Sequence, residues 1–282
     1  MVHHYTVIEF VLITFGISLA AGLAGAILGL GGGIIVVPAL TLLLDVPIRL
    51  AVGASIVSVI ATSSGAAAAY VREHMTNLRV GMFLEIGTTT GAITGAFIAG
   101  HIPLQWLFII FGVMMGYSAI EMFRNRREEG GPVPPDWWAD KLRLHGSYFD
   151  QVLQKQIDYR VTHTAIGVFL MYVAGCVSGL LGIGSGALKV PSMDLAMRLP
   201  IKVSTATSNF MIGVTAAASA GVYFARGEIS PLVAAPVAAG VLIGATSGSL
   251  VLPRLQNRRI RLLFVLVLLW ISAQMLWKGI HD

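Results

Sequence analysis

Two stretches of the sequence decide the fold: GLGGGIIVVP at residues 29–38 and GIGSGALKVP at residues 182–191. In each stretch closely spaced glycines are followed by a proline, and the second stretch lies 153 residues after the first. The same offset aligns much of the surrounding sequence. It pairs Gly22 with Gly175, Pro47 with Pro200, Ser55 with Ser208, Tyr70 with Tyr223, and Gly87, Gly91 and Gly95 with Gly240, Gly244 and Gly248. The chain is therefore an internal duplication.

The composition places the chain in a membrane. Of its 282 residues 56% are hydrophobic and 12% are charged, and the mean hydropathy is +0.79. Soluble domains carry about 25% charged residues. Apolar runs such as 10–38 and 50–71 are long enough to cross a hydrocarbon core of about 30 Å. These features exclude a soluble globular enzyme and a disordered chain, and they predict an all-α polytopic membrane protein rather than an outer-membrane barrel.

Each half contains five apolar segments. They cover about 6–28, 33–44, 49–71, 80–99 and 104–123 in the first half, and about 162–181, 186–197, 202–225, 231–250 and 260–278 in the second. The second segment of each half would extend only about 18 Å as a helix, which is too short to span. The predicted fold is two inverted repeats, each with a broken or re-entrant helix hairpin plus three spanning helices.

The predicted organisation has three parts. Residues 1–123 form the first transmembrane repeat, 124–160 a cytoplasmic linker, and 161–282 the second repeat. The first segment lacks a positively charged leader and is aligned with a mid-chain segment, so we expect it to remain in the mature protein. Within the linker we expect residues 137–157 to form an amphipathic helix at the interface, with Trp137 and Trp138 at headgroup level.

The distribution of lysine and arginine predicts the orientation. With the linker in the cytoplasm, inverted repeats place 16 of the 19 basic residues on or toward that side, and Arg49, Arg226 and Lys278 outside. This agrees with the positive-inside rule and predicts both termini outside the cytoplasm. The pI of about 9.6 therefore reflects topology, and we expect no nucleic-acid partner.

The paired glycine stretches predict the binding site. Glycines at a helix break let the backbone turn sharply and expose N–H groups at the positive end of the next helix, where an anion is favoured. Transporters built from inverted repeats bind their substrate between two such breaks. The candidate residues are Gly31, Gly32 and Gly33 in the first break and Gly184, Ser185 and Gly186 in the second. The alternative is that these glycines only allow close helix packing. Close packing is also our interpretation of the glycines spaced four residues apart, at 87–95 and 240–248.

Lys189 indicates the sign of the ligand. It follows the second break, where a cation opposes the helix dipole unless an anion shares the site, and the aligned residue in the first half is Val36. The alternative is that Lys189 extends to the cytoplasmic interface.

Hydroxyl and amide side chains follow on the next segment of each half. Ser55, Ser208 and Asn209 occupy corresponding places and are candidate hydrogen-bond donors to an oxyanion. Packing between helices is the alternative role for such residues.

Glu85 is the one acid in the segments that could carry a coupling proton, and the alternative is an interfacial carboxylate. No catalytic residue, metal site or cofactor is predicted. GIGSGA fits a dinucleotide-binding pattern only formally, since no strand precedes it. Cys176 has no cysteine partner, so we interpret it as a small buried residue.

The doubled glycine and proline motif resembles the signature of the sulfite exporter TauE/SafE family of membrane permeases. The resemblance covers nearly the whole chain outside the linker. It implies transport of small sulfur-containing anions, such as sulfite, sulfoacetate or other organosulfonates, across a bacterial-type inner membrane. Carried over by position, the motif comprises Gly29, Gly31, Gly32, Gly33 and Pro38 in the first half, and Gly182, Gly184, Gly186 and Pro191 in the second.

We therefore expect a multi-pass protein of the cell inner membrane that exports a small anion by alternating access. Its expected partners are that substrate and the lipid bilayer, with a homodimer as a candidate assembly. Two alternatives remain open at this point: a proton-coupled importer of thiosulfate-like anions that uses Glu85, and a membrane scaffold that transports nothing.

Overall fold

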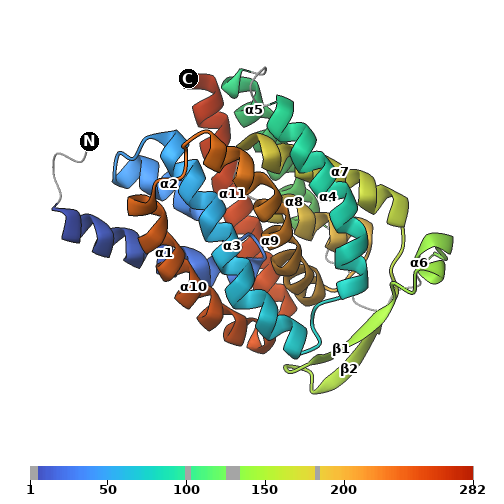
Figure 1. Cartoon of the computed structure of the whole chain (residues 1–282). Helices are drawn as coiled ribbons and strands as arrows, with labels where there is room; N and C mark the ends of the chain where they lie inside the picture. The colour runs from blue at the N-terminus through green and yellow to red at the C-terminus, as the bar shows by residue number, and fades with distance from the viewer. Residues whose placement is uncertain (1–5, 99–102, 125–133, 182–184, 282) are drawn as a thin grey trace.

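The computed structural model describes residues 6–98, 103–124, 134–181 and 185–281. Most of the described chain is helical (Figure 1). The first half contains α1 (Val7–Leu28), α2 (Gly33–Leu43), α3 (Ile48–Arg72), α4 (Leu78–Ile98) and α5 (Leu104–Arg124). The linker contains α6 (Trp137–Lys141), β1 (Gly146–Asp150) and β2 (Lys155–Tyr159). The second half contains α7 (Thr164–Leu181), α8 (Gly186–Pro191), η1 (Ser192–Ala196), α9 (Ile201–Ala225), α10 (Pro231–Val251), η2 (Leu252–Arg254) and α11 (Asn257–His281).

The apolar segments expected from the sequence agree with these helices to within a few residues. The short second segment is present in both halves. In the first half it is α2, and in the second it is α8, which continues into the single π-helical turn η1. Because α2 has 11 residues, it reaches about 16 Å, well short of a bilayer core.

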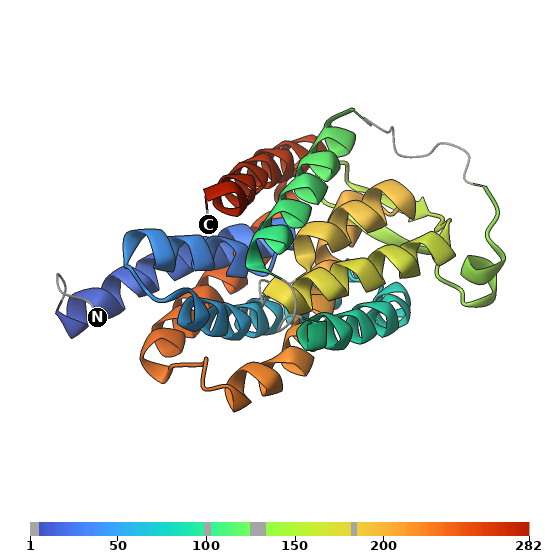
Figure 2. The ribbon, with the colours of Figure 1, turned by 90° about the horizontal axis from the view of Figure 1, so that it is seen from above.

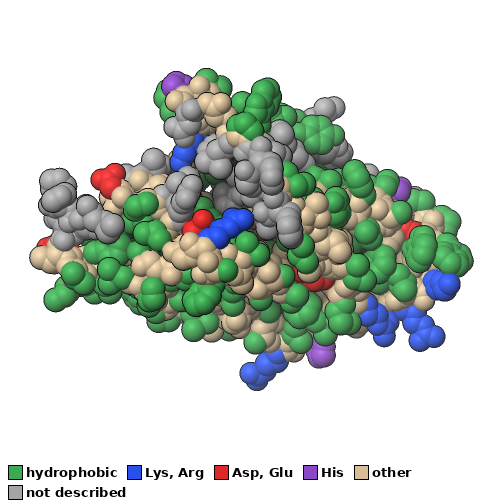
Figure 3. All heavy atoms as spheres, turned by 45° about the horizontal axis from the view of Figure 1, so that its top comes forward, with side chains coloured by type: hydrophobic (Ala, Val, Ile, Leu, Met, Phe, Trp, Pro, Cys, Tyr) green, Lys and Arg blue, Asp and Glu red, His purple; other side chains and the backbone are tan. Residues whose placement is uncertain are grey.

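The outer surface suits a lipid environment. Four helical stretches in the described residues are long and apolar enough to cross a membrane: Val7–Leu28, Leu50–Arg72, Pro231–Arg254 and Arg258–His281. Large apolar side chains such as Ile8 and Phe224 are 73% exposed. Hydrophobic side chains are spread over the described part of the face seen in Figure 3, among polar side chains and backbone. The protein is thus a membrane protein whose apolar segments are all α-helical.

The two halves are interlocked. Helix α1 packs along α10, and its counterpart α7 packs along α4, so that the first helix of each half lies against the fourth helix of the other (Figure 2). The glycines at four-residue spacing lie at these contacts: Gly95 faces the backbone of Cys176, and Gly248 faces that of Leu23. These two contacts are related by the 153-residue offset. The predicted role of the glycines in close helix contact is confirmed.

The linker differs from the expectation. The predicted amphipathic helix over residues 137–157 is wrong: α6 ends at Lys141, and β1 and β2 then form an antiparallel hairpin in which Ser147 pairs with Asp158. Along β1 burial alternates, with Tyr148 and Asp150 facing inward, which is the period of a strand and not of a helix. Asp150 Oδ1 also accepts the backbone N–H groups of residues 152 and 153 and so shapes the turn.

The hairpin is anchored by a buried ion pair. Lys202 Nζ, at the start of α9, lies 3.1 and 3.0 Å from the two carboxylate oxygens of Asp150, and both side chains are at most 2% exposed. Burial acts to raise the pKa of Asp150, but the hydrogen bonds from Lys202 and from two backbone N–H groups lower it below its ordinary value. The carboxylate is therefore charged at neutral pH.

A second anchor joins the hairpin to the first half. Asn77, between α3 and α4, donates through Nδ2 to the carbonyl oxygen of Leu144 and to the hydroxyl of Tyr159, at 2.8 and 2.9 Å. The backbone N–H of Asn77 donates to Thr207 on α9. The linker thus holds together one end of both repeats.

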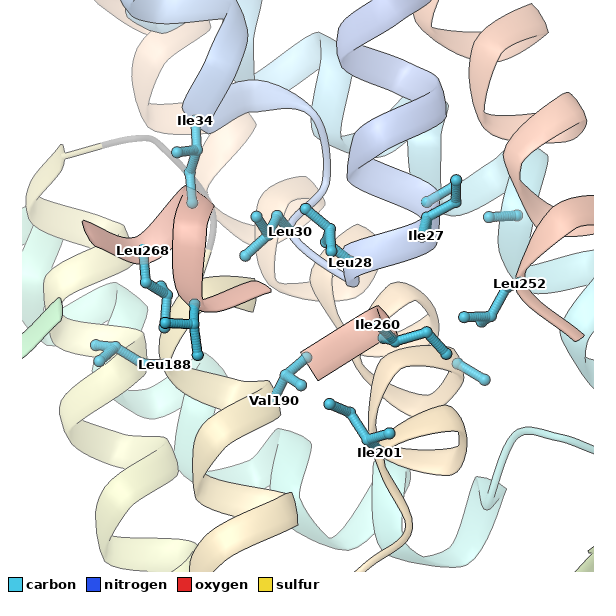
Figure 4. Close-up of a cluster of buried hydrophobic side chains, with 14 of the residues drawn as sticks. Ile27, Leu28, Leu30, Ile34, Leu188, Val190, Ile201, Leu252, Ile260 and Leu268 are labelled. Atoms are coloured by element: carbon cyan, nitrogen blue, oxygen red, sulfur yellow. The ribbon is translucent and has the colours of Figure 1, made fainter. Parts of the chain in front are cut away.

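The largest apolar cluster surrounds the break between α1 and α2. Figure 4 shows Leu30 and Ile34 from this region close to Leu188 and Val190 of α8, with Ile260 and Leu268 of α11 nearby. All these side chains are buried. The core of the molecule is therefore centred on the two short segments, where the sequence places the site.

The glycine contacts generate a stability prediction. A Cβ at Gly244 would lie 2.9 Å from the carbonyl carbon of Leu19, and one at Gly91 would lie 3.0 Å from that of Tyr172. We expect Gly244→Ala and Gly91→Ala each to lower the thermal unfolding temperature in detergent, because such overpacking costs about 1–3 kcal/mol. Gly16→Ala is the matched control, since nothing lies within 4 Å of its Cβ position. Equal unfolding temperatures for all three variants would contradict the tight-packing interpretation.

Candidate functional site

The first helix break is a buried turn made of glycines. Gly29 ends α1 with φ of 70°, and Gly31 and Gly32 follow with φ of 79° and 67°. This left-handed region is open to glycine at low cost. Residues 29–33 are all buried, so the non-helical backbone lies inside the protein, as membrane proteins require.

Side chains of α3 and α9 donate hydrogen bonds to carbonyl oxygens at the break. Ser208 Oγ donates to the carbonyl of Gly29 at 2.8 Å, and Thr62 Oγ1 donates to that of Gly31 at 3.1 Å. Asn209 Nδ2 donates to the carbonyl of Ala26 at 2.8 Å, and the hydroxyl of Tyr70 donates to the same oxygen. Ser208 and Asn209, which the sequence suggested as donors to the substrate, are therefore used to hold the first break in this conformation.

The start of α8 lies against the first break. A Cβ at Gly186 would collide with the carbonyl oxygen of Gly29 and would lie 2.8 Å from the Cα of Leu30. Gly184, together with Gly182 of the family motif, lies outside the described residues, and Ser185 is buried. The meeting of the two breaks therefore stays a prediction, and the close contact of Gly186 with the first break agrees with the packing alternative for this glycine.

Lys189 is buried at this junction. Its side chain is 0% exposed, its Nζ donates to Thr215 Oγ1 at 2.7 Å, and it lies 3.6 Å from Glu85 Oε2. The alternative in which Lys189 reaches the cytoplasmic interface is wrong for this structure. The reason is that α8 turns the lysine inward, toward α4 and α9.

Glu85 is the partner of this cation. The residue is 8% exposed, and its Oε1 accepts hydrogen bonds from Thr215 at 2.6 Å and from Thr89 at 3.1 Å. The interpretation of Glu85 as an interfacial carboxylate is therefore also wrong, because packing of α4 against α7 and α9 places it inside the bundle.

Thr215 was not among the candidates from the sequence. Its hydroxyl accepts from Lys189 and donates to Glu85, so it joins the two charged groups. A signal existed, since Thr215 lies seven residues after Ser208 and so falls on the same face of α9.

Five buried polar atoms on the candidate residues and on Thr205 have no hydrogen-bond partner among the described residues. They are Ser55 Oγ, Ser185 Oγ, Thr205 Oγ1, Asn209 Oδ1 and Glu85 Oε2. Buried polar atoms are nearly always paired in folded proteins. Ser185 directly precedes α8, and Thr205 and Asn209 lie against the first break, so the unused hydrogen-bonding capacity of these three residues supports a site for a polar solute there.

A groove of about 610 Å³ lies between α3 and α9. Its lining is mostly apolar and includes Ser63, Phe210, Gly213 and Val214. These α9 residues lie on the face opposite Ser208 and Thr215, so we do not assign the groove to the site. Among the described residues no group of three His, Cys, Asp or Glu side chains is placed to hold a metal ion.

A helix break buried inside an apolar bundle, with a buried ion pair in the helices around it, is typical of polytopic membrane transport proteins. The comparison with protein families gives the particular family. The model of the sulfite exporter TauE/SafE family matches residues 14–275, and the chain belongs to this family. Members of the family and the relatives below are membrane transporters, not enzymes.

Three relatives illustrate the similarity. The chain is 27% identical over 273 residues to the probable membrane transporter protein YunE of Bacillus subtilis, covering 94% of this chain and 97% of the relative. It is 26% identical over 240 residues to YdhB of the same organism, covering 85% and 87% of the two chains. A probable membrane transporter protein of Xylella fastidiosa is 23% identical over 275 residues, covering 96% and 97%. No solved structure matches the chain significantly.

The buried ion pair can be tested by a double-mutant cycle. Breaking a buried pair by removing one partner costs about 3–5 kcal/mol, because the remaining charge stays buried without compensation. We therefore expect Lys189→Met and Glu85→Gln each to lower stability, measured as unfolding in detergent. The double variant Lys189→Met/Glu85→Gln should recover most of the loss. Losses that simply add would show that the two groups do not interact.

Proposed function

We propose that this chain is a secondary transporter that exports small sulfur-containing anions, such as sulfite, sulfoacetate or other organosulfonates. The anion would bind between the two helix breaks, which alternately open to the two sides of the membrane. The observation that carries the proposal is Lys189, a cation that is 0% exposed at the junction of the breaks. A buried ammonium needs a negative partner; Glu85 stands 3.6 Å from Lys189 in this structure, and an oxyanion substrate would take the same role.

The surrounding groups fit an oxyanion. A sulfite or sulfonate group presents three oxygens that accept hydrogen bonds. The hydroxyls of Ser55, Ser185 and Thr205 are buried and have no partner among the described residues. Together with the Lys189 ammonium, they supply donors of the kind that such an anion requires. The glycines of the breaks, Gly31, Gly32 and Gly33, would let the backbone approach the anion closely.

Export of an anion can be driven by the membrane potential alone. Because the cytoplasm is negative, outward movement of one negative charge gains about 2.3 kcal/mol per 100 mV, equivalent to a gradient of about 50-fold. This agrees with the scarcity of acidic residues in the spanning helices.

We infer that the halves are inverted in the membrane, with the linker in the cytoplasm of a bacterial-type cell and both termini outside. The interlocked packing of α1 on α10 and of α7 on α4 supports a two-fold relation between residues 1–123 and 161–282. The start of α1 and the end of α11 lie toward the end of the bundle away from the hairpin (Figure 1, Figure 2).

This orientation predicts the labelling pattern of introduced cysteines. In a Cys176→Ser background, a cysteine at Ser147 in the exposed hairpin should react with a membrane-impermeant thiol reagent only after the cells are permeabilised. A cysteine at Asp282 should react in intact cells. Labelling of both positions from the same side would overturn the inverted arrangement.

A second candidate is a proton-coupled importer of thiosulfate-like anions. The burial of Glu85 against Lys189 favours it, since a carboxylate in this position can carry a proton. Import that rises with an inward proton gradient, and that loses this dependence in Glu85→Gln, would support the importer. The scaffold alternative receives no support, because the family is one of transporters.

Ligand-dependent thermal unfolding of the purified protein tests the anion site. The panel is sulfite, sulfoacetate, taurine, thiosulfate, sulfate and chloride. A ligand at 100 times its Kd stabilises the folded state by about 2.7 kcal/mol. We expect stabilisation by one or more of the sulfur oxyanions. The double variant Lys189→Met/Glu85→Gln, which lacks both charges, should show no such shift. If no anion stabilises the folded wild-type protein, the proposal is wrong.

A further inference from the structure

The pair formed by Lys189 and Glu85 connects the two repeats. Lys189 belongs to α8 in the second half, and Glu85 belongs to α4 in the first. Thr215 on α9 binds both groups, at 2.7 Å from Lys189 Nζ and 2.6 Å from Glu85 Oε1. The negative group that faces the buried cation is therefore supplied by the protein itself.

A carrier that exports an anion without a second solute must return empty. During this return the Lys189 ammonium would be buried without its substrate, at a cost of several kcal/mol for an unpaired ion. Such a cost would slow the return step. Glu85 removes the cost in the conformation seen here, since its carboxylate faces the ammonium.

We propose that Glu85 is a substrate surrogate: it occupies the anion's place beside Lys189 in the empty carrier, and the arriving anion displaces it. The inference rests on the proposed function, because it requires an anionic substrate at Lys189. One negative group then faces the ammonium in both the empty and the loaded carrier, so that both can cross between the two open states, while the displaced carboxylate keeps its hydrogen bond from Thr89 and turns toward the water-filled path by which the anion entered.

The geometry is that of a replaceable partner. Glu85 Oε2 is 3.6 Å from Lys189 Nζ, which is longer than a good hydrogen bond, and it has no hydrogen-bond partner among the described residues. The carboxylate is held through Oε1 alone, by Thr215 and Thr89. Thr215 Oγ1 also lies 3.1 Å from the carbonyl oxygen of Met211, so its hydroxyl has a second acceptor when Glu85 leaves.

Removal of the surrogate charge has opposite effects on binding and on the return step. In Glu85→Gln the amide keeps the shape of the side chain and can accept from Thr215, but it no longer competes for the ammonium. In wild type the anion binds only to the fraction of carriers in which Glu85 is away from Lys189, and this lowers the apparent affinity. We therefore expect the apparent Kd for the anion to be about tenfold lower, or lower still, in Glu85→Gln. Net efflux should fall by a similar factor, because the empty carrier now returns with an unpaired Lys189.

The experiment measures binding and two kinds of transport with sulfite as the probe. Wild type and Glu85→Gln are reconstituted into liposomes loaded with labelled sulfite, and efflux is followed with and without unlabelled sulfite outside. The surrogate role predicts that Glu85→Gln binds sulfite more tightly, retains exchange and loses net efflux. Glu228→Gln, the same substitution in the loop after α9, is the control and should behave like wild type.

The outcomes separate the inference from the proposed function. If Glu85→Gln shows wild-type affinity and net efflux, or loses binding and exchange together, the surrogate role is wrong while the anion site stands. If wild type neither binds nor exchanges any anion of the panel, the proposed function itself fails.

Glu85→Asp provides a second variant in case the glutamine variant is unstable. It keeps the charge but withdraws the carboxylate from Lys189 by one methylene group. We expect tighter sulfite binding than in wild type together with measurable net efflux. Weaker binding in Glu85→Asp would overturn the inference.

Discussion

The structure depends on one constraint: backbone that leaves the helical path inside an apolar bundle must find its hydrogen bonds within the protein. At the first break the glycines supply the turn, and the carbonyls of Ala26, Gly29 and Gly31 receive hydrogen bonds from side chains of α3 and α9. Helices α3 and α9 therefore do more than span the membrane, since their polar faces hold the break in place. The arrangement also explains two of the hydroxyl groups that follow the glycine stretches, those of Thr62 and Ser208.

The interlocked packing adds a second consequence. Because α1 lies on α10 and α7 on α4, neither half forms a separate unit, and the site is built from both. Lys189, Glu85 and Thr215 come from three helices and from both repeats. The ion pair therefore lies at a contact between the two halves, which is where the transport mechanism that we propose would require a rearrangement.

The linker is a structural part of the same assembly. Its hairpin binds α9 through Lys202 and Asp150, and it binds the turn between α3 and α4 through Asn77. These polar anchors lie at one end of the helices that carry the site (Figure 1). The linker therefore restrains the end of the bundle that we assign to the cytoplasm.

The sequence by itself determined the membrane class, the internal duplication, the positions of the helices and the family, because apolar periodicity and glycine spacing are local properties of the chain. It also singled out Lys189 and Glu85. Only the tertiary structure decided that these two residues meet, that Thr215 joins them, and that Ser208 and Asn209 bind the backbone of the first break. It also replaced the predicted linker helix by a hairpin, since Asp150 is held by Lys202, 52 residues away. Such contacts depend on which helix faces are brought together in space, and no local pattern in the chain specifies that.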